Sequence, residues 1–268
     1  MRTKRDLPTN SLLLTFDDGY IDHYLNVFPI LMANKIRGLF AVPGKPLTEN
    51  KVLAVNKIHF ILAIVGEDRK QDLLATVYKL LNRYRGTEFD FPSNEELYDK
   101  LAIANRFDDK DIIFIKRLLQ MELPEWVRDR IIDDLFRIYI PISEGAFSRE
   151  LYMNFEQIRL MKRSGMDFAV HGYEHYWLGK LTQREMKKDI NKSLETLEGI
   201  VDSNDWTMVF PYGSYNPEVL AYISDKGCKL GFTTEVRVAD LQADTPLVLP
   251  RLDTTDFPPQ SENYLEIT

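Results

Sequence analysis

The 268-residue sequence contains a single cysteine, Cys228, so no disulfide bond can form within the chain. A lone cysteine mildly favours a reducing compartment, although secreted proteins without disulfides exist. Residues 1–10 lack the apolar core of a secretion signal, and the short apolar run that follows ends at Asp17. We therefore expect a cytoplasmic protein.

The sequence also lacks a long apolar run and an excess of basic residues. The most apolar later stretch, Val52–Val65, is too short to cross a bilayer and contains Asn56, Lys57 and His59. The 34 Lys and Arg residues are outnumbered by 41 Asp and Glu residues, which gives a formal charge of −7. Because nucleic-acid binding draws on a basic surface, we predict no nucleic-acid partner and no stable membrane insertion.

What the sequence does contain is enough apolar residues for one sizeable core, and short runs of them favour buried strands. Runs that are apolar on both faces are typical of a parallel sheet covered by helices. Six such runs are predicted as strands: Leu12–Phe16, Gly38–Val42, Asp167–Val170, Thr207–Phe210, Leu230–Thr234 and Leu247–Leu249.

Helix start signals separate several of these strands. Asn154 and Thr182 each precede a Gln or Glu by three residues, as in a capping box, and the second helix runs toward Gly199. Asn216 stands before a proline, and Gly227 is a plausible stop for that helix. The alternation of strands and helices predicts an α/β fold with a parallel sheet or barrel.

Residues 48 to about 150 break this alternation with successive amphipathic helical patterns. Ser93 and Glu96 form another capping box, and Pro124 suits a helix start. We interpret the segment as a helical insertion in a single domain that spans residues 1–268. The predicted helices are Asp68–Arg85, Asn94–Asn105, Lys110–Met121 and Glu125–Ile138.

Two stretches carry unusual polar residues at strand ends. Asp17 and Asp18 follow the first predicted strand, and His171 and His175 follow the third with a spacing of four. Two imidazoles on one helical turn suit a shared metal ion, although Gly172 after the first histidine excludes a zincin signature. Two histidines and one carboxylate leave positions open for water and substrate, and a neighbouring carboxylate could act as a general base.

A third stretch, FPYGSYN, follows the strand that ends at Phe210. Its proline and glycine fix the backbone, and such a loop can aim a main-chain N–H at a developing oxyanion. Taken alone, it is a turn that leads into a helix.

Four segments in this order resemble the polysaccharide deacetylases, also called the NodB-homology group or carbohydrate esterase family 4. They are Thr15–Gly19 (TFDDG), His171–His175 (HGYEH), Phe210–Gly213 (FPYG) and Leu249–Asp253 (LPRLD). The resemblance covers about residues 11–47 and 150–255. It implies a distorted (β/α)7-type barrel, with the large helical insertion placed after the second core strand.

The resemblance also implies roles for individual residues. Asp17 would be the general base, and Asp18, His171 and His175 would hold the metal. The backbone N–H of Tyr212 would help to stabilise the oxyanion. The implied reaction is hydrolysis of an N-acetyl, less often an O-acetyl, group on a sugar.

The sequence departs from the family pattern at two points. Val209 stands where many members have an arginine, so Arg251 either orients Asp17 in its place or pairs with Asp253 or another acid. The late leucine-rich motif lacks its usual histidine, which leaves the general acid open. The candidates are His23, His59 and a water molecule on the metal, and a purely structural role is the alternative for each histidine. We select His59 as the acid, because an apolar helix seldom carries the sequence Lys-Ile-His without a reason.

We therefore predict a metal-dependent hydrolase of non-peptide C–N bonds that deacetylates an amino sugar. The substrate would be a nucleotide-linked, lipid-linked or oligosaccharide precursor of surface polysaccharide, such as O-antigen, capsule or lipopolysaccharide. Zinc is the expected ion, with cobalt, nickel, manganese and iron as alternatives. Two other functions stay open: an amidohydrolase that acts on a non-sugar C–N bond, and a catalytically silent sugar-binding homologue.

Overall fold

The computed structural model describes residues 7–8, 11–66, 68–87, 90–103 and 109–262. Most of segment 1–10, on which the expectation about a secretion signal rests, lies outside these residues. The chain divides into two compact units. Unit 1 holds the described residues of Met1–Asn50 and Ser148–Thr268, and unit 2 holds those of Lys51–Phe147. Within the described ranges, no helix is both long and apolar enough to cross a membrane.

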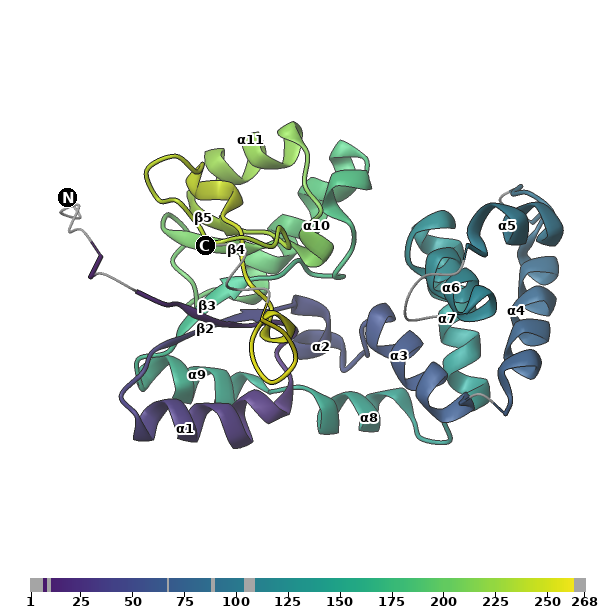
Figure 1. The fold of residues 1–268 in the computed structure, drawn as a ribbon, viewed down its shortest axis with the longest axis horizontal. Coiled ribbons are helices and arrows are strands. Elements are labelled where there is room, and N and C mark those ends of the chain that lie inside the picture. Colours follow the sequence, from purple (N-terminus) through teal and green to yellow (C-terminus); the bar gives the residue numbers. More distant parts are fainter. Residues whose placement is uncertain (1–6, 9–10, 67, 88–89, 104–108, 263–268) are drawn as a thin grey trace. The chain divides into compact units, whose positions relative to one another are not determined.

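Unit 1 is built on a parallel sheet whose five strands lie in sequence order (Figure 1). Phe16 pairs with Phe40 in the first ladder, and Val170 pairs with Met208 in the third. This confirms the predicted α/β fold with a parallel sheet, while closure into a seven-stranded barrel stays a prediction. The strands are β1 (Leu14–Phe16), β2 (Gly38–Val42), β3 (Asp167–Val170), β4 (Trp206–Val209) and β5 (Cys228–Phe232).

Three helices of unit 1 begin where the sequence signals predict. Asn154 and Thr182 form complete capping boxes with Gln157 and Glu185, and the Asn216 side chain accepts a hydrogen bond from the Val219 N–H. The helices are α1 (Phe28–Ala33), α2 (Gly44–Glu49), α9 (Phe155–Arg163), α10 (Gln183–Thr196) and α11 (Pro217–Asp225), with a π-helix at His23–Val27. A further helix, α8 (Glu144–Leu151), precedes α9.

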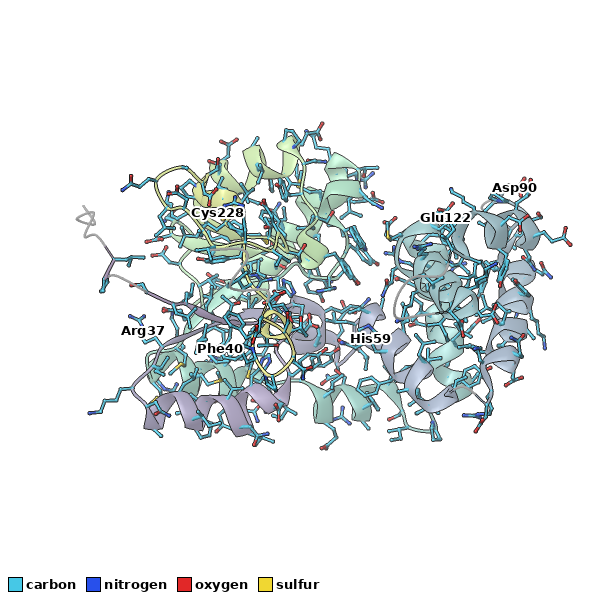
Figure 2. The ribbon with its side chains drawn as sticks, in the orientation of Figure 1. Arg37, Phe40, His59, Asp90, Glu122 and Cys228 are labelled. Atoms are coloured by element: carbon cyan, nitrogen blue, oxygen red, sulfur yellow. The ribbon has the colours of Figure 1, made fainter. Side chains whose placement is uncertain are left out.

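The two faces of the sheet have different neighbours. Phe40, Phe168 and Met208 on one face belong to a large cluster that includes buried residues of α1, α9, α10 and α11. Figure 2 shows Phe40 among these packed side chains. The alternate residues, such as Ala41 and Ala169, form a smaller cluster with Leu249. Helices therefore cover one face, and the carboxyl-terminal part of the chain covers the other.

The sixth predicted strand is wrong. Residues 246–248 form a 3-10 turn, and Leu249 makes only an isolated parallel bridge to Phe232. Pro246 and Pro250 flank the segment, and proline has no N–H to donate to a ladder. The Leu249 N–H donates to the Gly231 carbonyl at 2.7 Å, so a single residue is all that extends the sheet here.

Unit 2 lies between β2 and β3 in the sequence, inside the segment predicted as an insertion, and is helical. The Ser93 capping box is present, and Pro124 is the cap of the helix that follows it. The single-domain organisation stays a prediction. The helices are α3 (Ala54–Val65), α4 (Lys70–Tyr84), α5 (Asn94–Leu101), α6 (Lys110–Arg117) and α7 (Glu125–Tyr139), with a π-helix at Leu118–Glu122. The end of the second predicted helix, residues 104–105, lies outside the described residues.

The single cysteine is part of the core. Cys228 opens β5 and is 4% exposed (Figure 2). Burial raises the pKa of its thiol to about 11, so the thiolate is scarce at neutral pH. We therefore assign Cys228 to packing.

Candidate active site

The polar motifs meet at one edge of the sheet, because parallel strands all end on the same side. Asp17 and Asp18 follow β1, His171 follows β3, and Tyr212 lies three residues after β4. Ligand sites of α/β proteins occur at this carboxyl edge. Asp18 and His171, which are more than 150 positions apart in the sequence, therefore lie close together within unit 1.

Asp18, His171 and His175 form a candidate metal centre. One ligand atom from each lies within 4.8 Å of the others. The Asp18 Oδ1 atom is 3.5 Å from the His171 Nε2 and 3.3 Å from the His175 Nε2. Both histidines are buried, at 2% and 8% exposed. The three side chains predicted as metal ligands therefore do converge.

The chemistry of this set fits a divalent cation. Among the described residues, the buried Asp18 Oδ1 has no hydrogen-bond partner. The His171 Nδ1 lies 2.7 Å from the Val209 carbonyl, and an N–H there leaves a lone pair on Nε2. Burial lowers the pKa of His175, which favours the neutral imidazole that metals bind. An oxygen and two imidazole nitrogens are thus directed at one point, with open positions around it.

The second carboxylate, Asp17, faces an arginine. Arg251 donates from its two terminal nitrogens to the two Asp17 oxygens at 2.9 and 2.8 Å. It also donates to the Thr15 hydroxyl at 3.1 Å and to the Thr233 carbonyl at 3.0 Å. Of the two alternatives left open by the sequence, the structure places Arg251 on Asp17, while the Asp253 carboxylate accepts from Thr255.

The surroundings keep Asp17 ionised. Burial alone would raise its pKa, but His171 in its protonated form and the hydrogen bonds from Arg251 lower the pKa overall. For Asp18, burial would likewise raise the pKa, and the two histidines lower it well below its ordinary value. Both carboxylates are therefore available as anions at neutral pH.

Strained backbone is concentrated at this edge. Among the described residues, five that are not glycine have positive φ, and three of them are Asp18 (71°), His175 (61°) and Tyr212 (57°). Each such conformation costs of the order of 1–3 kcal/mol, and it persists where the surrounding contacts hold the backbone in place. The three residues belong to three different loops, so each loop turns sharply where it presents a site residue.

Aromatic rings support the third loop. Tyr212 stacks on Trp177 with centroids 4.5 Å apart and meets the His175 ring at 4.8 Å. A Cβ added at Gly213 would lie 2.2 Å from the Thr234 hydroxyl, so only glycine fits beside Tyr212. Sequence reasoning missed Trp177, for which the only signal was an aromatic residue two positions after His175.

The other two histidines occupy different environments. His23 is 9% exposed and its ring contacts the rings of Phe16, Tyr20 and Phe40. Burial lowers the pKa of His23, so it is neutral at pH 7. His59 is an exposed residue on α3 in unit 2 (Figure 2). A general-acid role for either histidine stays a prediction.

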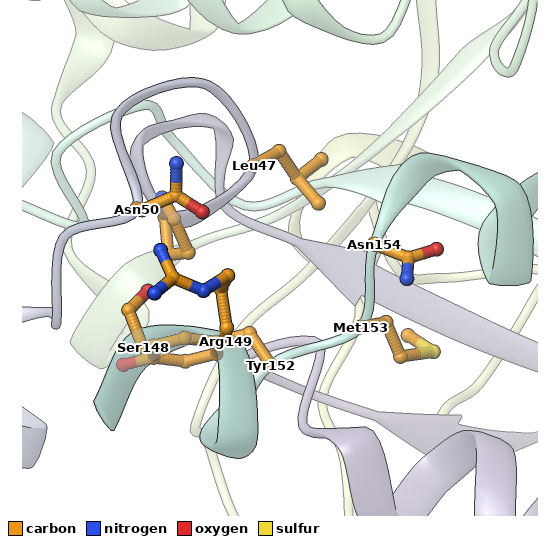
Figure 3. Close-up of a pocket in the computed structure, with 8 residues that line it drawn as sticks. Leu47, Asn50, Ser148, Arg149, Tyr152, Met153 and Asn154 are labelled. Carbon is orange, nitrogen blue, oxygen red and sulfur yellow. The ribbon is translucent and has the colours of Figure 1, made fainter. Parts of the chain in front are cut away.

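A cavity of about 170 Å³ in unit 1 is lined by residues that contact Gly19 and Tyr20, the two residues after Asp18. Figure 3 shows Arg149 and Asn50 at one end and Met153 at the other. The Met153 N–H donates to the Gly19 carbonyl at 2.9 Å. Tyr152, which also lines the cavity, stacks on Tyr20, whose hydroxyl donates to the Asp18 Oδ2 at 3.1 Å. The cavity wall is thus connected to the turn that carries Asp18.

Comparison with protein families supplies an independent line of support. The family model described as polysaccharide deacetylase matches residues 144–231, which include His171, His175 and Tyr212. The predicted polysaccharide deacetylase resemblance is confirmed. Members of this family are hydrolases that act on the C–N bonds of N-acetyl sugars.

Solved deacetylase structures share the fold. The Streptococcus pyogenes deacetylase PplD, in complex with acetate, has a TM-score of 0.54 and 17% identity over 97% of this chain and 71% of its own. IcaB from Ammonifex degensii gives 0.51 and 18% over 96% and 74%. A de-N-acetylase from Aggregatibacter actinomycetemcomitans gives 0.50 and 17% over 97% and 77%. No curated protein matched the sequence.

Proposed function

We propose that this protein is a metal-dependent deacetylase that hydrolyses the N-acetyl group of an amino sugar. The observation that carries the proposal is the convergence of Asp18, His171 and His175 beside a second carboxylate, Asp17, that Arg251 holds ionised. Two imidazoles and one carboxylate form a hydrolytic metal set, and the neighbouring anion supplies the base such chemistry needs.

Asp18, His171 and His175 would hold the ion. A bound divalent cation supplies Lewis acidity toward the acetyl carbonyl and lowers the pKa of a bound water toward about 7. The mixed nitrogen and oxygen donor set favours zinc, and it also accepts cobalt, nickel, manganese or iron.

The protein residues would divide the remaining work. Asp17 would take the proton of the attacking water, whose oxygen bonds to the acetyl carbon. Arg251 would fix the direction of the Asp17 carboxylate through its two-point contact. The backbone N–H of Tyr212 would stabilise the oxyanion, as the resemblance implies. The C–N bond then breaks, the amine takes up a proton, and acetate is released.

The source of the amine proton and the identity of the sugar are separate questions. His59 stays our proposed acid. His23 is less suited to the role because its lowered pKa leaves it without a spare proton at pH 7. A nucleotide-linked or lipid-linked precursor of surface polysaccharide and a cytoplasmic location stay predictions from the sequence.

The proposal is tested by measuring acetate release from a panel of N-acetylated sugars with metal-loaded protein. We expect release from at least one sugar, loss of release with a chelator, and recovery when metal is added back. Turnover of non-sugar amides alone would instead support the amidohydrolase. Sugar binding without acetate release would support the silent homologue.

A further inference from the structure

The turn between the two candidate metal ligands is held by groups outside the metal centre. Gly172, Tyr173 and Glu174 separate His171 from His175, and Gly172 has a φ of 70°. Because His175 is itself left-handed, the turn reverses sharply so that both imidazoles face Asp18. The intrinsic backbone preferences of residues 172–175 do not by themselves determine this reversal.

One side of the turn is bonded to a buried carboxylate on α10. The Asp189 Oδ2 accepts the Tyr173 N–H at 2.8 Å, and its Oδ1 accepts the Glu174 N–H at 2.9 Å. Asp189 is 6% exposed and forms no ion pair with any residue that the structure describes. Each Asp189 oxygen therefore accepts a hydrogen bond from one of two consecutive backbone N–H groups between the histidines.

The other side of the turn is bonded to the start of α2. The Gly44 N–H donates to the Gly172 carbonyl at 3.1 Å, and the Lys45 N–H donates to the Tyr173 carbonyl at 3.0 Å. Gly44 cannot be larger here, because an added Cβ would lie 2.5 Å from the Tyr173 ring. The backbone of the turn is thus fixed through two carbonyls and two N–H groups.

Burying the Asp189 carboxylate at this position costs desolvation free energy. Burial raises the pKa of Asp189 to about 6, which means that the anion is disfavoured there. Packing alone could be supplied by an apolar residue at lower cost. A carboxylate offers what an apolar residue or an amide does not, namely two acceptor oxygens side by side for two adjacent N–H groups.

We infer that Asp189 is a positioning residue that sets the turn between His171 and His175, and thereby the affinity of the centre for its metal ion. The inference rests on the proposed metal centre. Residues that orient metal ligands without touching the ion typically contribute 10- to 100-fold to metal affinity or activity. Asp189 would raise metal affinity by holding the turn in its binding conformation, because the ion then does not have to pay the entropy cost of ordering the two histidines.

The test measures zinc affinity of the full chain by competition with a chromophoric chelator. We expect Asp189→Asn to weaken affinity about tenfold, since an amide can accept only one of the two N–H groups. Asp189→Ala, which removes both acceptors, should approach 100-fold. The matched control is Asp134→Asn in unit 2, a buried carboxylate that accepts from Tyr84, and it should leave zinc affinity unchanged.

Two further measurements keep the inference open to refutation. The visible spectrum of the cobalt-loaded Asp189→Asn variant should differ from that of the wild type, because ligand geometry changes. In the wild-type protein without metal, the Tyr173 and Glu174 amides should already be protected from hydrogen exchange. Folded variants with zinc affinity within twofold of the wild type, or unprotected amides in the wild type, would overturn the inference. Failure of the wild type to bind zinc would instead refute the proposed metal centre.

Discussion

At the residue scale, two adjacent aspartates have opposite surroundings. Asp17 faces the guanidinium of Arg251, whereas Asp18 faces two imidazoles. Adjacent residues can differ in this way because Asp18 is left-handed, which turns its side chain out of the direction that β1 sets. The positive φ of Asp18 therefore separates the proposed base from the proposed metal ligand.

Replacement of Asp17 should slow catalysis strongly and leave metal binding unchanged. We expect Asp17→Asn to reduce kcat by 100- to 10,000-fold, the usual contribution of a general base. Zinc affinity should stay near the wild-type value because Asp17 is not among the three converging ligands. Acetate release and metal content measure the two effects. Asp22→Asn, an exposed change nearby, is the control, and a fully active Asp17→Asn variant would remove the base from the mechanism.

Replacement of Arg251 should move the pH dependence. Arg251 lowers the pKa of Asp17, so Arg251→Gln raises that pKa and leaves less of the ionised base at acidic pH. The acid limb of kcat/KM should move to higher pH, with the loss largest below neutral and partly recovered above it. Arg237→Gln removes an arginine–carboxylate pair elsewhere and should leave the limb in place. An unchanged limb in Arg251→Gln would contradict the coupling.

The sequence predicted the converging residues but not how all of them are held. The candidate ligands were recognisable because they belong to two pairs, Asp17 with Asp18 and His171 with His175. Each pair follows the end of an apolar run. The partner of Arg251 was undecidable, since Asp17 lies 234 positions away and Asp253 only two. Asp189 left no signal at all, because an aspartate on a helix is ordinarily a solvated residue.

At the scale of elements, helix caps were predictable because they depend on local chemistry. The capping boxes at Ser93, Asn154 and Thr182 were all correctly read. The segment 247–249 was misread because its apolar residues resemble a strand while its flanking prolines forbid one. Helices α2 and α8 were not predicted, since each is under nine residues and α2 has no side-chain cap.

Loss of a cap should destabilise the protein modestly. We expect Thr182→Ala to lower the free energy of unfolding by about 1 kcal/mol, because the amide at Glu185 loses its acceptor. Chemical denaturation measures the change. Gln183→Ala, an exposed substitution one residue later, should stay within about 0.5 kcal/mol of the wild type. Equal effects of the two substitutions would show that the cap contributes nothing.

At the scale of the whole molecule, all three candidate ligands belong to one of two compact units. A segment of low strand signal between two recognisable strands indicated where the second unit lies in the sequence. The catalytic role of His59, a residue of the second unit, stays a prediction.

Metal should therefore protect the two units unequally. At a free zinc concentration 100 times the Kd, binding stabilises the folded state by about 2.7 kcal/mol. In hydrogen exchange followed by mass spectrometry, peptides from β1, β3 and α10 should gain protection, and those from α4 and α7 should gain less. The variant His171→Ala should show no gain in either unit. Equal gains across both units of the wild type would contradict this expectation.

The bonds that hold the turn between the histidines have a consequence for how this chain can change. Gly44 and Lys45 make their contacts to the turn before the chain leaves for unit 2 at Lys51, and it returns at Ser148. Asp189 and Arg251 lie beyond that return. An exchange of the segment 51–147 would therefore leave the bonds of Gly44, Lys45, Asp189 and Arg251 in place. Among the residues that we propose for the site, it would remove His59 alone.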